Sequence, residues 1–297
     1  MLGRSGIKIE GCMDTIMQVG ESALIVEGGA MRGVFSCGVL DHFLAQEFSP
    51  FDSFWGVSAG ASNLAAYLAK MPGRNLKIYL DYSRRKEFIN LRQYLGGGDL
   101  MDLDWMWRIT LEELGIDKRV LREDPRPFFL VVARQDSGYA EYHTPDVDSL
   151  AETMKASSAL PIMYRHGVEL GEHRYVDGGV ADAIPVAEAI ARGARKIMVL
   201  RSRPASYRKG GEKFKPLLKR LLRDTPELIE PMLTRSERYN QTLALIENPP
   251  PGVQIIQVCP PESFKLKRLS RDASSLQSAY QLGLELGHSA INEWQKL

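Results

Sequence analysis

Residues 53–70 read SFWGVSAGASNLAAYLAK, and this stretch contains the pattern that decides the fold. Ser53–Val57 is short, apolar and aromatic, which is typical of a buried strand. Ala59–Lys70 is rich in alanine and leucine and predicts a helix. Ser58 stands between them, inside the small-residue turn of residues 56–60. A buried strand that runs directly into a helix is typical of α/β proteins.

The alternation of strand and helix continues on both sides of this stretch. Apolar runs predict strands at 23–27, 128–133, 196–200 and 253–258, and helical patterns fall at 33–47, 150–159 and 186–194. Because strands alternate with helices, we expect a mainly parallel central sheet with helices on both faces. Residues 138–143 and 168–176 alternate polar with apolar side chains and predict antiparallel strands added to that sheet. The predicted fold is a three-layer α/β sandwich.

Composition divides the chain into regions. We expect a leader at 1–20, an α/β domain at 21–205 and a basic, mostly helical C-terminal extension at 206–297, with one strand near 253–258. Residues 88–126 hold few strand-like runs, so they are predicted to form an insertion or lid over one edge of the sheet.

Charge and cysteine content exclude several classes of protein. Lys and Arg number 38 and Asp and Glu 37, a formal net charge of +1, which argues against a nucleic-acid partner. Cys12, Cys37 and Cys259 form an odd, scattered set, so no disulfide framework is expected. The N-terminus lacks the apolar run of a signal peptide, and no run reaches the ~20 residues of a membrane span. We therefore expect a cytoplasmic protein.

The sequence Gly56-Val57-Ser58-Ala59-Gly60 matches G-x-S-x-G. In that motif the serine sits on a sharp turn between a strand and a helix, where its hydroxyl is exposed as a nucleophile. Gly56 and Gly60 would leave room for the backbone at such a turn. The alternative is a tight turn whose serine only caps the helix. The strand before Ser58 and the helix after it favour the nucleophile.

A second turn, Gly28-Gly29-Ala30-Met31-Arg32-Gly33, also follows a strand and opens a helix. Backbone N–H groups around Gly29–Met31 can bind an oxyanion, and Arg32 adds positive charge. One alternative is a dinucleotide cradle, but G-x-A-x-x-G is one glycine short of that fingerprint. The other is a purely structural glycine turn. The oxyanion hole is the favoured interpretation.

Asp177 ends a predicted strand directly before Gly178 and Gly179, so its carboxylate can project into a crevice. The alternative is an Asp-Gly turn residue that bonds its own backbone. A Ser-His-Asp triad would need a histidine on a late loop. The chain has five histidines, at positions 42, 143, 166, 173 and 288. His288 is the only late one, and it falls in a helical stretch, which argues against the triad.

Taken together, GGAMRG (28–33), GVSAG (56–60) and DGG (177–179) resemble the motifs of the patatin-like phospholipases. SSALP (157–161) resembles the Ser-x-Ala-x-Pro segment that the family carries before the aspartate. The resemblance covers about residues 20–200 and departs from the family only at Ala30, where glycine is usual. The tail beyond 205 resembles extensions of bacterial members, and no chemistry is assigned to it.

The resemblance implies a Ser–Asp dyad, with Ser58 as nucleophile and Asp177 as base. It implies cleavage of carboxylic ester bonds of lipids through an acyl-enzyme, with no cofactor and no metal. Two alternatives remain open: a non-catalytic lipid- or acyl-binding protein with the same fold, and an esterase with a Ser-His-Asp triad. The expected partner is a lipid or acyl-ester substrate, and the oligomeric state is left open.

Two apolar features outside the motifs bear on lipid binding. Residues 214–223 predict an amphipathic helix, with Lys215, Lys219, Arg220 and Arg223 beside an apolar stripe. Such a helix either packs on the domain or makes peripheral contact with an anionic membrane. A second cluster lines an acyl pocket, forms a lid or belongs to the core. It comprises Met101, Trp105, Met106, Trp107 and Ile109.

Overall fold

The computed structural model describes residues 17–211 and 215–297. Within them, one sheet has the strand order β5-β6-β3-β2-β1-β7-β8, and β4 pairs with β3. The strands are β1 (Ser22–Val26), β2 (Ser53–Val57), β3 (Phe128–Arg134), β4 (Ala140–His143), β5 (Val168–Leu170), β6 (His173–Asp177), β7 (Lys196–Leu200) and β8 (Gln254–Val258). The pairs from β3 through β2, β1 and β7 to β8 are parallel. Strands β4, β5 and β6 join by antiparallel pairing, so both parts of the sheet prediction are confirmed.

Helices occupy the connections and most of the tail. They are η1 (Ala30–Gly33), α1 (Val34–Ala45), α2 (Ala59–Leu68), α3 (Arg74–Lys77), η2 (Ile78–Tyr82), α4 (Leu91–Leu95), α5 (Leu103–Glu113), α6 (Lys118–Glu123), α7 (Leu150–Ser158), η3 (Gly178–Val180), α8 (Val186–Ala191), α9 (Lys215–Leu221), η4 (Pro226–Leu228), α10 (Ile229–Glu247) and α11 (Ala273–Trp294). No helix among the described residues is long and apolar enough to cross a membrane.

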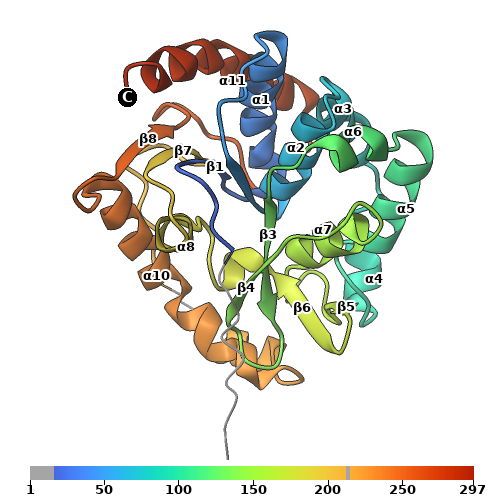
Figure 1. Ribbon diagram of the computed structural model, residues 1–297. Helices are drawn as coiled ribbons and strands as arrows, with labels where there is room; N and C mark the ends of the chain where they lie inside the picture. The colour runs from blue at the N-terminus through green and yellow to red at the C-terminus, as the bar shows by residue number, and fades with distance from the viewer. Residues whose placement is uncertain (1–16, 212–214) are drawn as a thin grey trace, which may run out of the picture.

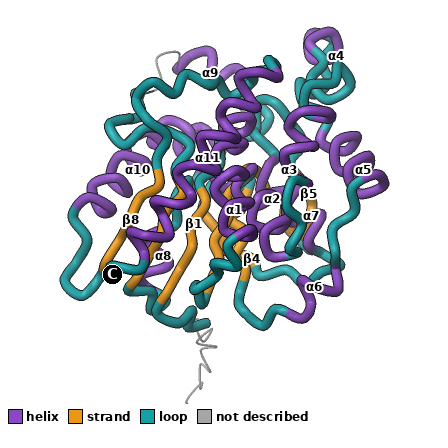
Figure 2. The backbone as a smooth tube through the Cα atoms, turned by 90° about the horizontal axis from the view of Figure 1, so that it is seen from above, coloured by secondary structure: helices purple, strands orange, loops and turns teal. Residues whose placement is uncertain are grey.

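The sheet separates two apolar cores, which makes the three-layer sandwich. Along β1, Leu24 and Val26 pack in the core shared with α1, α2 and α11, whereas Ala23 and Ile25 face the core beside α8 and α10. This alternation is the two-residue period of a strand buried on both faces. Figure 1 shows α1 and α11 on one side of the strands and α8 and α10 on the other. Figure 2 shows the strands in the middle of the molecule with helices around them.

The C-terminal extension continues the same sheet. β8 pairs with β7 across the predicted division at residue 205. Helix α11 packs closely along α1, because a Cβ at Gly38 would lie 2.2 Å from the Tyr280 carbonyl oxygen. A Cβ at Gly283 would lie 2.2 Å from the Phe35 carbonyl oxygen. Glycine at both positions therefore allows the tail to cover one face of the sheet.

Residues 88–126 contain α4, α5 and α6, and Ile89 and Met101 form an isolated bridge. Their apolar side chains share a core with Val132 of β3 and Tyr175 of β6, so this segment covers the antiparallel part of the sheet.

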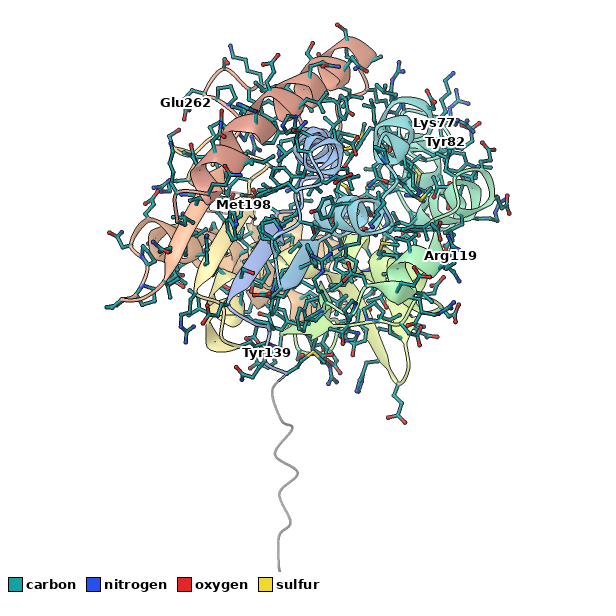
Figure 3. All side chains as sticks on the ribbon, turned by 45° about the horizontal axis from the view of Figure 1, so that its top comes forward. Lys77, Tyr82, Arg119, Tyr139, Met198 and Glu262 are labelled. Atoms are coloured by element: carbon teal, nitrogen blue, oxygen red, sulfur yellow. The ribbon has the colours of Figure 1, made fainter. Side chains whose placement is uncertain are left out.

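Residues 1–16 of the predicted leader lie outside the described residues. Figure 3 contrasts the interior, where Met198 is fully buried, with the periphery, where Tyr139 is exposed.

Candidate active site

Three turns meet at one edge of the sheet because neighbouring parallel strands end there. Gly28 comes two residues after β1, Ser58 directly after β2, and Arg203 three residues after β7. The carboxyl ends of parallel strands are where α/β proteins place ligand sites. Side chains and backbone from all three turns line one cavity.

Asp177 reaches this cavity from the antiparallel part of the sheet. On β3, Val131 pairs with Val57 of β2, and the next residue, Val132, pairs with Asp177 of β6. This register sets the end of β6 beside the end of β2. Ser58 and Asp177 therefore line the same cavity, which has a volume of about 50 Å³.

Ser58 occupies a strained turn. Its backbone has φ 54° and ψ −124°, a left-handed conformation that costs a non-glycine residue roughly 1–3 kcal/mol. The Ser58 N–H donates to Ser157 Oγ at 2.8 Å, and the Ser157 hydroxyl donates to a carbonyl oxygen of β3 at 2.7 Å. A Cβ at Gly60 would lie 2.3 Å from a β1 carbonyl oxygen, and one at Gly56 would lie 2.5 Å from Ala61 Cα. These contacts explain both glycines of the motif and hold Ser58 in place.

Asp177 is buried, with 3% of its surface exposed. Its Oδ1 accepts a hydrogen bond of 2.8 Å from the Gly179 N–H, so it also forms the predicted Asp-Gly turn. Burial raises the pKa of Asp177, while the Arg235 charge, the neighbouring Ser58 side chain and the Gly179 N–H act in the opposite direction. A Cβ at Gly178 would lie 2.1 Å from a β3 carbonyl oxygen, so the turn fits only glycine there.

The 28–33 turn presents fewer free amides than its sequence suggests. The Met31 N–H donates to the Arg268 carbonyl oxygen and the Arg32 N–H to the Gly29 carbonyl oxygen, each at 3.2 Å. The N–H groups of Gly28 and Gly29 donate to no described residue. The Ala30 N–H likewise donates to no described residue, so an oxyanion bound at this turn would meet the amides of residues 28–30, whereas those of Met31 and Arg32 are already engaged.

The remaining residues of this turn have different surroundings. Ala30 has φ 48°, again left-handed, and lines the cavity beside Ser58. The side chain of Arg32 also lines that cavity and is only 4% exposed. Gly33 lies behind the turn, where a Cβ would be 2.5 Å from the Tyr79 hydroxyl. Met31 contributes to a second cavity.

This second cavity, of about 120 Å³, is lined mainly by apolar side chains and meets the first one at Ser58. Ala30, Ser58 and Leu160 line both. Of the apolar cluster predicted either to line an acyl pocket or to form core, Met101, Met106 and Trp107 line this cavity. Trp105 and Ile109 instead pack against the core beneath it.

The first cavity is strongly basic, which the sequence motifs did not indicate. Its cationic lining residues are Arg32, Arg203, Lys209, Arg235 and Arg268. Burial lowers the pKa of Arg32 and of Arg235 to about 10 each. Burial and the charges of Arg235 and Arg268 lower the pKa of Lys209 to about 6. Four of the five cations follow residue 200, and none of these four was predicted from the sequence as a site residue.

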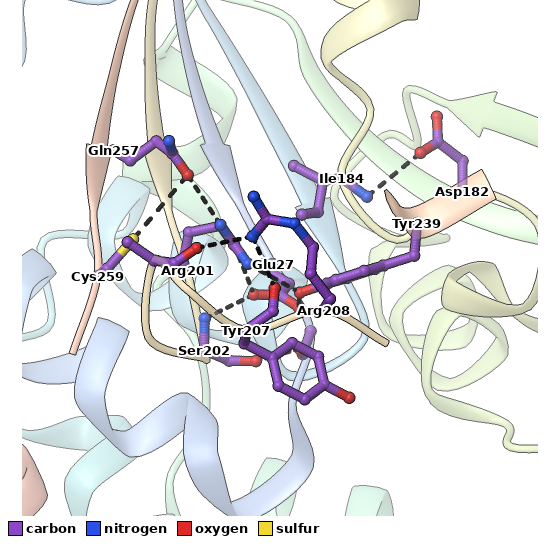
Figure 4. Close-up of polar contacts among 12 residues, drawn as sticks. Glu27, Asp182, Ile184, Arg201, Ser202, Tyr207, Arg208, Tyr239, Gln257 and Cys259 are labelled. Carbon is purple, nitrogen blue, oxygen red and sulfur yellow. Dashed lines mark hydrogen bonds and ion pairs between the residues drawn. The ribbon is translucent and has the colours of Figure 1, made fainter. Parts of the chain in front are cut away.

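Glu27, directly after β1, is the one acidic residue besides Asp177 among the described residues of this lining. Its carboxylate accepts hydrogen bonds from the Tyr239 hydroxyl at 2.8 Å and from the Ser202 N–H at 2.6 Å. Arg201, 1% exposed, lies 3.6 Å from the same carboxylate (Figure 4). The negative charge of Glu27 is thus balanced by Arg201, which does not line the cavity.

Histidine is absent from the linings of both cavities, although all five histidines belong to the described residues. His143 contacts Glu141 at 2.9 Å, and His173 contacts Arg134 at 3.1 Å. His288, the late candidate, is exposed on α11 and its ring lies against that of His42. The geometry gives no support to a Ser-His-Asp triad.

Comparison with known proteins agrees with these motifs. The patatin-like phospholipase family model matches residues 24–190, and a domain of unknown function, DUF6363, matches residues 225–297. The uncharacterized protein YjjU of Escherichia coli (strain K12) is 34% identical over 271 residues, which cover 90% of this chain and 76% of YjjU.

Among solved structures, VipD from Legionella pneumophila aligns with a TM-score of 0.44 at 13% identity, covering 92% of this chain and 67% of VipD. The family model alone spans more than half of the chain and includes every motif discussed above. The chain therefore belongs to the patatin-like phospholipase family, a family of lipid hydrolases.

Proposed function

We propose that this protein hydrolyses carboxylic ester bonds of lipids, with Ser58 as nucleophile and Asp177 as general base. The observation that carries the proposal is the arrangement of these two residues. Ser58 sits in a strained strand-to-helix turn, lines the same small cavity as Asp177 and lowers the pKa of that carboxyl group. A serine beside a base in a cavity is the arrangement needed for nucleophilic catalysis.

In the proposed reaction, Asp177 takes the proton of the Ser58 hydroxyl as Oγ attacks the ester carbonyl carbon. The tetrahedral oxyanion accepts hydrogen bonds from the Gly28 and Gly29 amides. The ester C–O bond then breaks, and the leaving oxygen takes the proton from Asp177. Water next attacks the acyl-enzyme while Asp177 accepts a water proton, and this proton returns to Ser58 as the fatty acid leaves. Because burial raises the pKa of Asp177, it is a stronger base than an exposed carboxylate.

The apolar cavity suits the acyl chain of such a substrate. Met106, Trp107 and Met154 line it, and Ser58 lies at its junction with the basic cavity. An ester carbonyl at Ser58 would place its acyl chain against these apolar side chains and its leaving group on the other side. Pockets that bind apolar ligands in other proteins are likewise lined mainly by hydrophobic side chains.

The test is Ser58→Ala, compared with Ser206→Ala as a matched control on an exposed loop. We expect Ser58→Ala to abolish hydrolysis of a short p-nitrophenyl ester and labelling by a fluorophosphonate, with no loss of fold. Ser206→Ala should retain both. Unchanged hydrolysis by the folded Ser58→Ala variant would contradict the proposal. Labelling of the wild type without turnover of any ester would instead favour the lipid-binding alternative.

We also propose peripheral membrane contact through α9 and the residues that follow it. Phe214 of the predicted 214–223 helix lies outside the described residues, but the rest of its apolar stripe divides in two. Leu218 and Leu222 are buried, whereas Leu217 and Leu221 are 53% and 41% exposed beside basic side chains. Replacing the four basic residues of this segment with Glu should weaken sedimentation with anionic vesicles and spare soluble esters. Equal sedimentation of the wild type with neutral vesicles would contradict this contact.

A further inference from the structure

Ser202, two residues after β7, holds the 28–33 turn from outside the cavity. Its hydroxyl donates a hydrogen bond of 3.0 Å to the Gly28 carbonyl oxygen. A Cβ at Gly29 would lie 2.8 Å from Ser202 Cβ, so glycine at position 29 is what allows this close approach. Ser202 is 1% exposed and does not line the cavity that Gly28 and Gly29 line. Its contact with the turn therefore does not depend on a ligand.

The bond from Ser202 fixes the direction of the Gly29 N–H. The peptide bond between Gly28 and Gly29 is trans, and the C=O and N–H of a trans peptide point in opposite directions. Because the Gly28 carbonyl oxygen points at Ser202, the Gly29 N–H points away from Ser202. That N–H has no acceptor among the described residues. The Gly29 amide is therefore held ready to donate to a ligand beside Ser58.

A second contact holds the far side of the same turn. The Met31 N–H donates to the Arg268 carbonyl oxygen at 3.2 Å. Arg268 belongs to the segment matched by DUF6363, residues 225–297. The turn is thus fixed at the Gly28 carbonyl oxygen and at the Met31 N–H, on either side of residues 29 and 30. The amides of these two residues remain free.

Glu27 in turn holds Ser202. One carboxylate oxygen of Glu27 accepts the Ser202 N–H at 2.6 Å, and the other accepts the Tyr239 hydroxyl at 2.8 Å (Figure 4). Arg201 donates to the same Tyr239 hydroxyl at 3.2 Å and supplies the opposite charge. Since both oxygens of Glu27 are engaged, this carboxylate is a support for the turn and not a second base. Tyr239 also lies in the DUF6363 segment.

We propose that Ser202 and Glu27 are positioning residues for the oxyanion, and that Tyr239 of the DUF6363 segment secures them. Through the Gly28 carbonyl they hold the Gly29 amide in the direction that the developing charge requires. A donor fixed before the reaction stabilises that charge without having to reorient. The proposal rests on the proposed function, because the oxyanion forms from an ester at Ser58. It gives the DUF6363 segment a part in catalysis through the support of this turn.

The first experiment is Ser202→Ala, which removes the hydroxyl and keeps the N–H that Glu27 accepts. We expect kcat for a short p-nitrophenyl ester to fall by about tenfold, less than the roughly 10²–10³-fold loss of a direct donor. KM should stay within about twofold, because the bond matters in the transition state. The matched control is Ser53→Ala, which removes a buried serine hydroxyl at the start of β2 and should keep its kcat. Urea titration verifies that both variants fold.

The second readout is inhibition by an alkyl trifluoromethyl ketone, which mimics the tetrahedral intermediate. Ser58 Oγ bonds to the ketone carbon, its proton passes to Asp177, and the carbonyl π electrons become the oxyanion. The inhibition constant should rise by the same factor of about ten in Ser202→Ala and stay unchanged in Ser53→Ala. The acid limb of the kcat/KM profile should not move, because the Ser202 hydroxyl acts on the turn and not on Asp177.

Three results for folded Ser202→Ala would each overturn the positioning role. They are a wild-type kcat, a fall in kcat without an equal loss of inhibitor affinity, and a shift of the acid limb. A purely structural role would lower the free energy of unfolding and leave kcat and inhibitor affinity in place. Hydrolysis that survives Ser58→Ala would instead refute the proposed function, so the two failures are distinguishable.

Tyr239→Phe tests the contribution of the DUF6363 segment. It removes the hydroxyl that Glu27 accepts and should lower kcat and inhibitor affinity together by about fivefold. Combined with Ser202→Ala, the loss should be smaller than the product of the single losses, because both act through one amide. Single losses that multiply in full would show that Tyr239 acts independently of Ser202, and would overturn the part assigned to the segment.

Discussion

The two cavities that meet at Ser58 come from different parts of the chain. Every residue that lines the apolar cavity lies within residues 24–190, the segment matched by the patatin-like family model. The residues of the basic cavity that lie beyond that segment are Arg203, Tyr207, Lys209, Arg235, Tyr239 and Arg268. The family domain therefore supplies the apolar cavity, and the region beyond it supplies four of the five cations that line the basic one.

The largest expected effect is common to both cavities. Asp177→Asn removes the proposed base and should lower kcat by roughly 10³–10⁴-fold for neutral and anionic esters alike. Added to Ser58→Ala, it should cause little further loss, because the two residues act as a unit. Asp182→Asn, a nearby carboxylate that accepts a hydrogen bond from Tyr142, is the matched control and should keep its activity.

Initial rates on neutral and on anionic esters measure the predicted fall in kcat of Asp177→Asn. Replacing each histidine in turn should leave activity within about tenfold of the wild type. Removing a member of a Ser-His-Asp triad would lower kcat by roughly 10⁴-fold. A folded variant silenced by removal of one histidine would break the dyad model and restore the Ser-His-Asp alternative.

A smaller effect should be confined to the apolar cavity. Met106 is buried in its wall, so Met106→Trp should fill space that a long acyl chain needs. We expect kcat/KM for long-chain esters to fall by roughly tenfold while short-chain esters change little. Chain-length profiles measure this directly. If short-chain esters lost rate equally, the substitution would have disturbed the surroundings of Ser58, and the comparison between the two cavities would fail.

Arg235 lines the basic cavity, and its charge also affects the pKa of Asp177. Its positive charge stabilises the carboxylate and lowers the pKa of Asp177, against the larger effect of burial. Arg235→Gln should therefore move the acid limb of the kcat/KM profile to higher pH. Because the base must be ionised, activity is lost as the pH falls through the pKa of Asp177. An acid limb that stays in place would show that the charge of Arg235 does not govern the ionisation of Asp177.

Local sequence predicted the strands, the elbow and the two glycine turns because these depend on neighbouring residues. The meeting of Asp177 with Ser58 depends on strand register, which no local pattern contains, and was reached only through family resemblance. The register is set by β3, where Val131 pairs with Val57 of β2 and the next residue, Val132, pairs with Asp177 of β6.

The basic cavity was beyond sequence reasoning for a related physical reason. Arg235 and Tyr239 are four residues apart on α10, one helical turn, but only packing of α10 against the sheet aims them at Ser58. Arg268 lies on a loop, and its carbonyl oxygen accepts a hydrogen bond from the Met31 N–H. That contact also explains why the Met31 amide, counted in the predicted oxyanion hole, is already engaged.

The smallest expected effect concerns Ala30, which borders both cavities and departs from the family's usual glycine. Its φ of 48° carries the steric cost of a left-handed residue with a Cβ, about 1–2 kcal/mol. Glycine removes that cost but loses roughly 0.5–1 kcal/mol through the entropy of the unfolded chain. Ala30→Gly should therefore raise the free energy of unfolding by about 0.5 kcal/mol, measured by urea titration. Ala187→Gly, on the exposed side of α8, should lower it by about 1 kcal/mol. If both variants lose stability equally, Ala30 is unstrained, and the turn that joins the two cavities tolerates a side chain without cost.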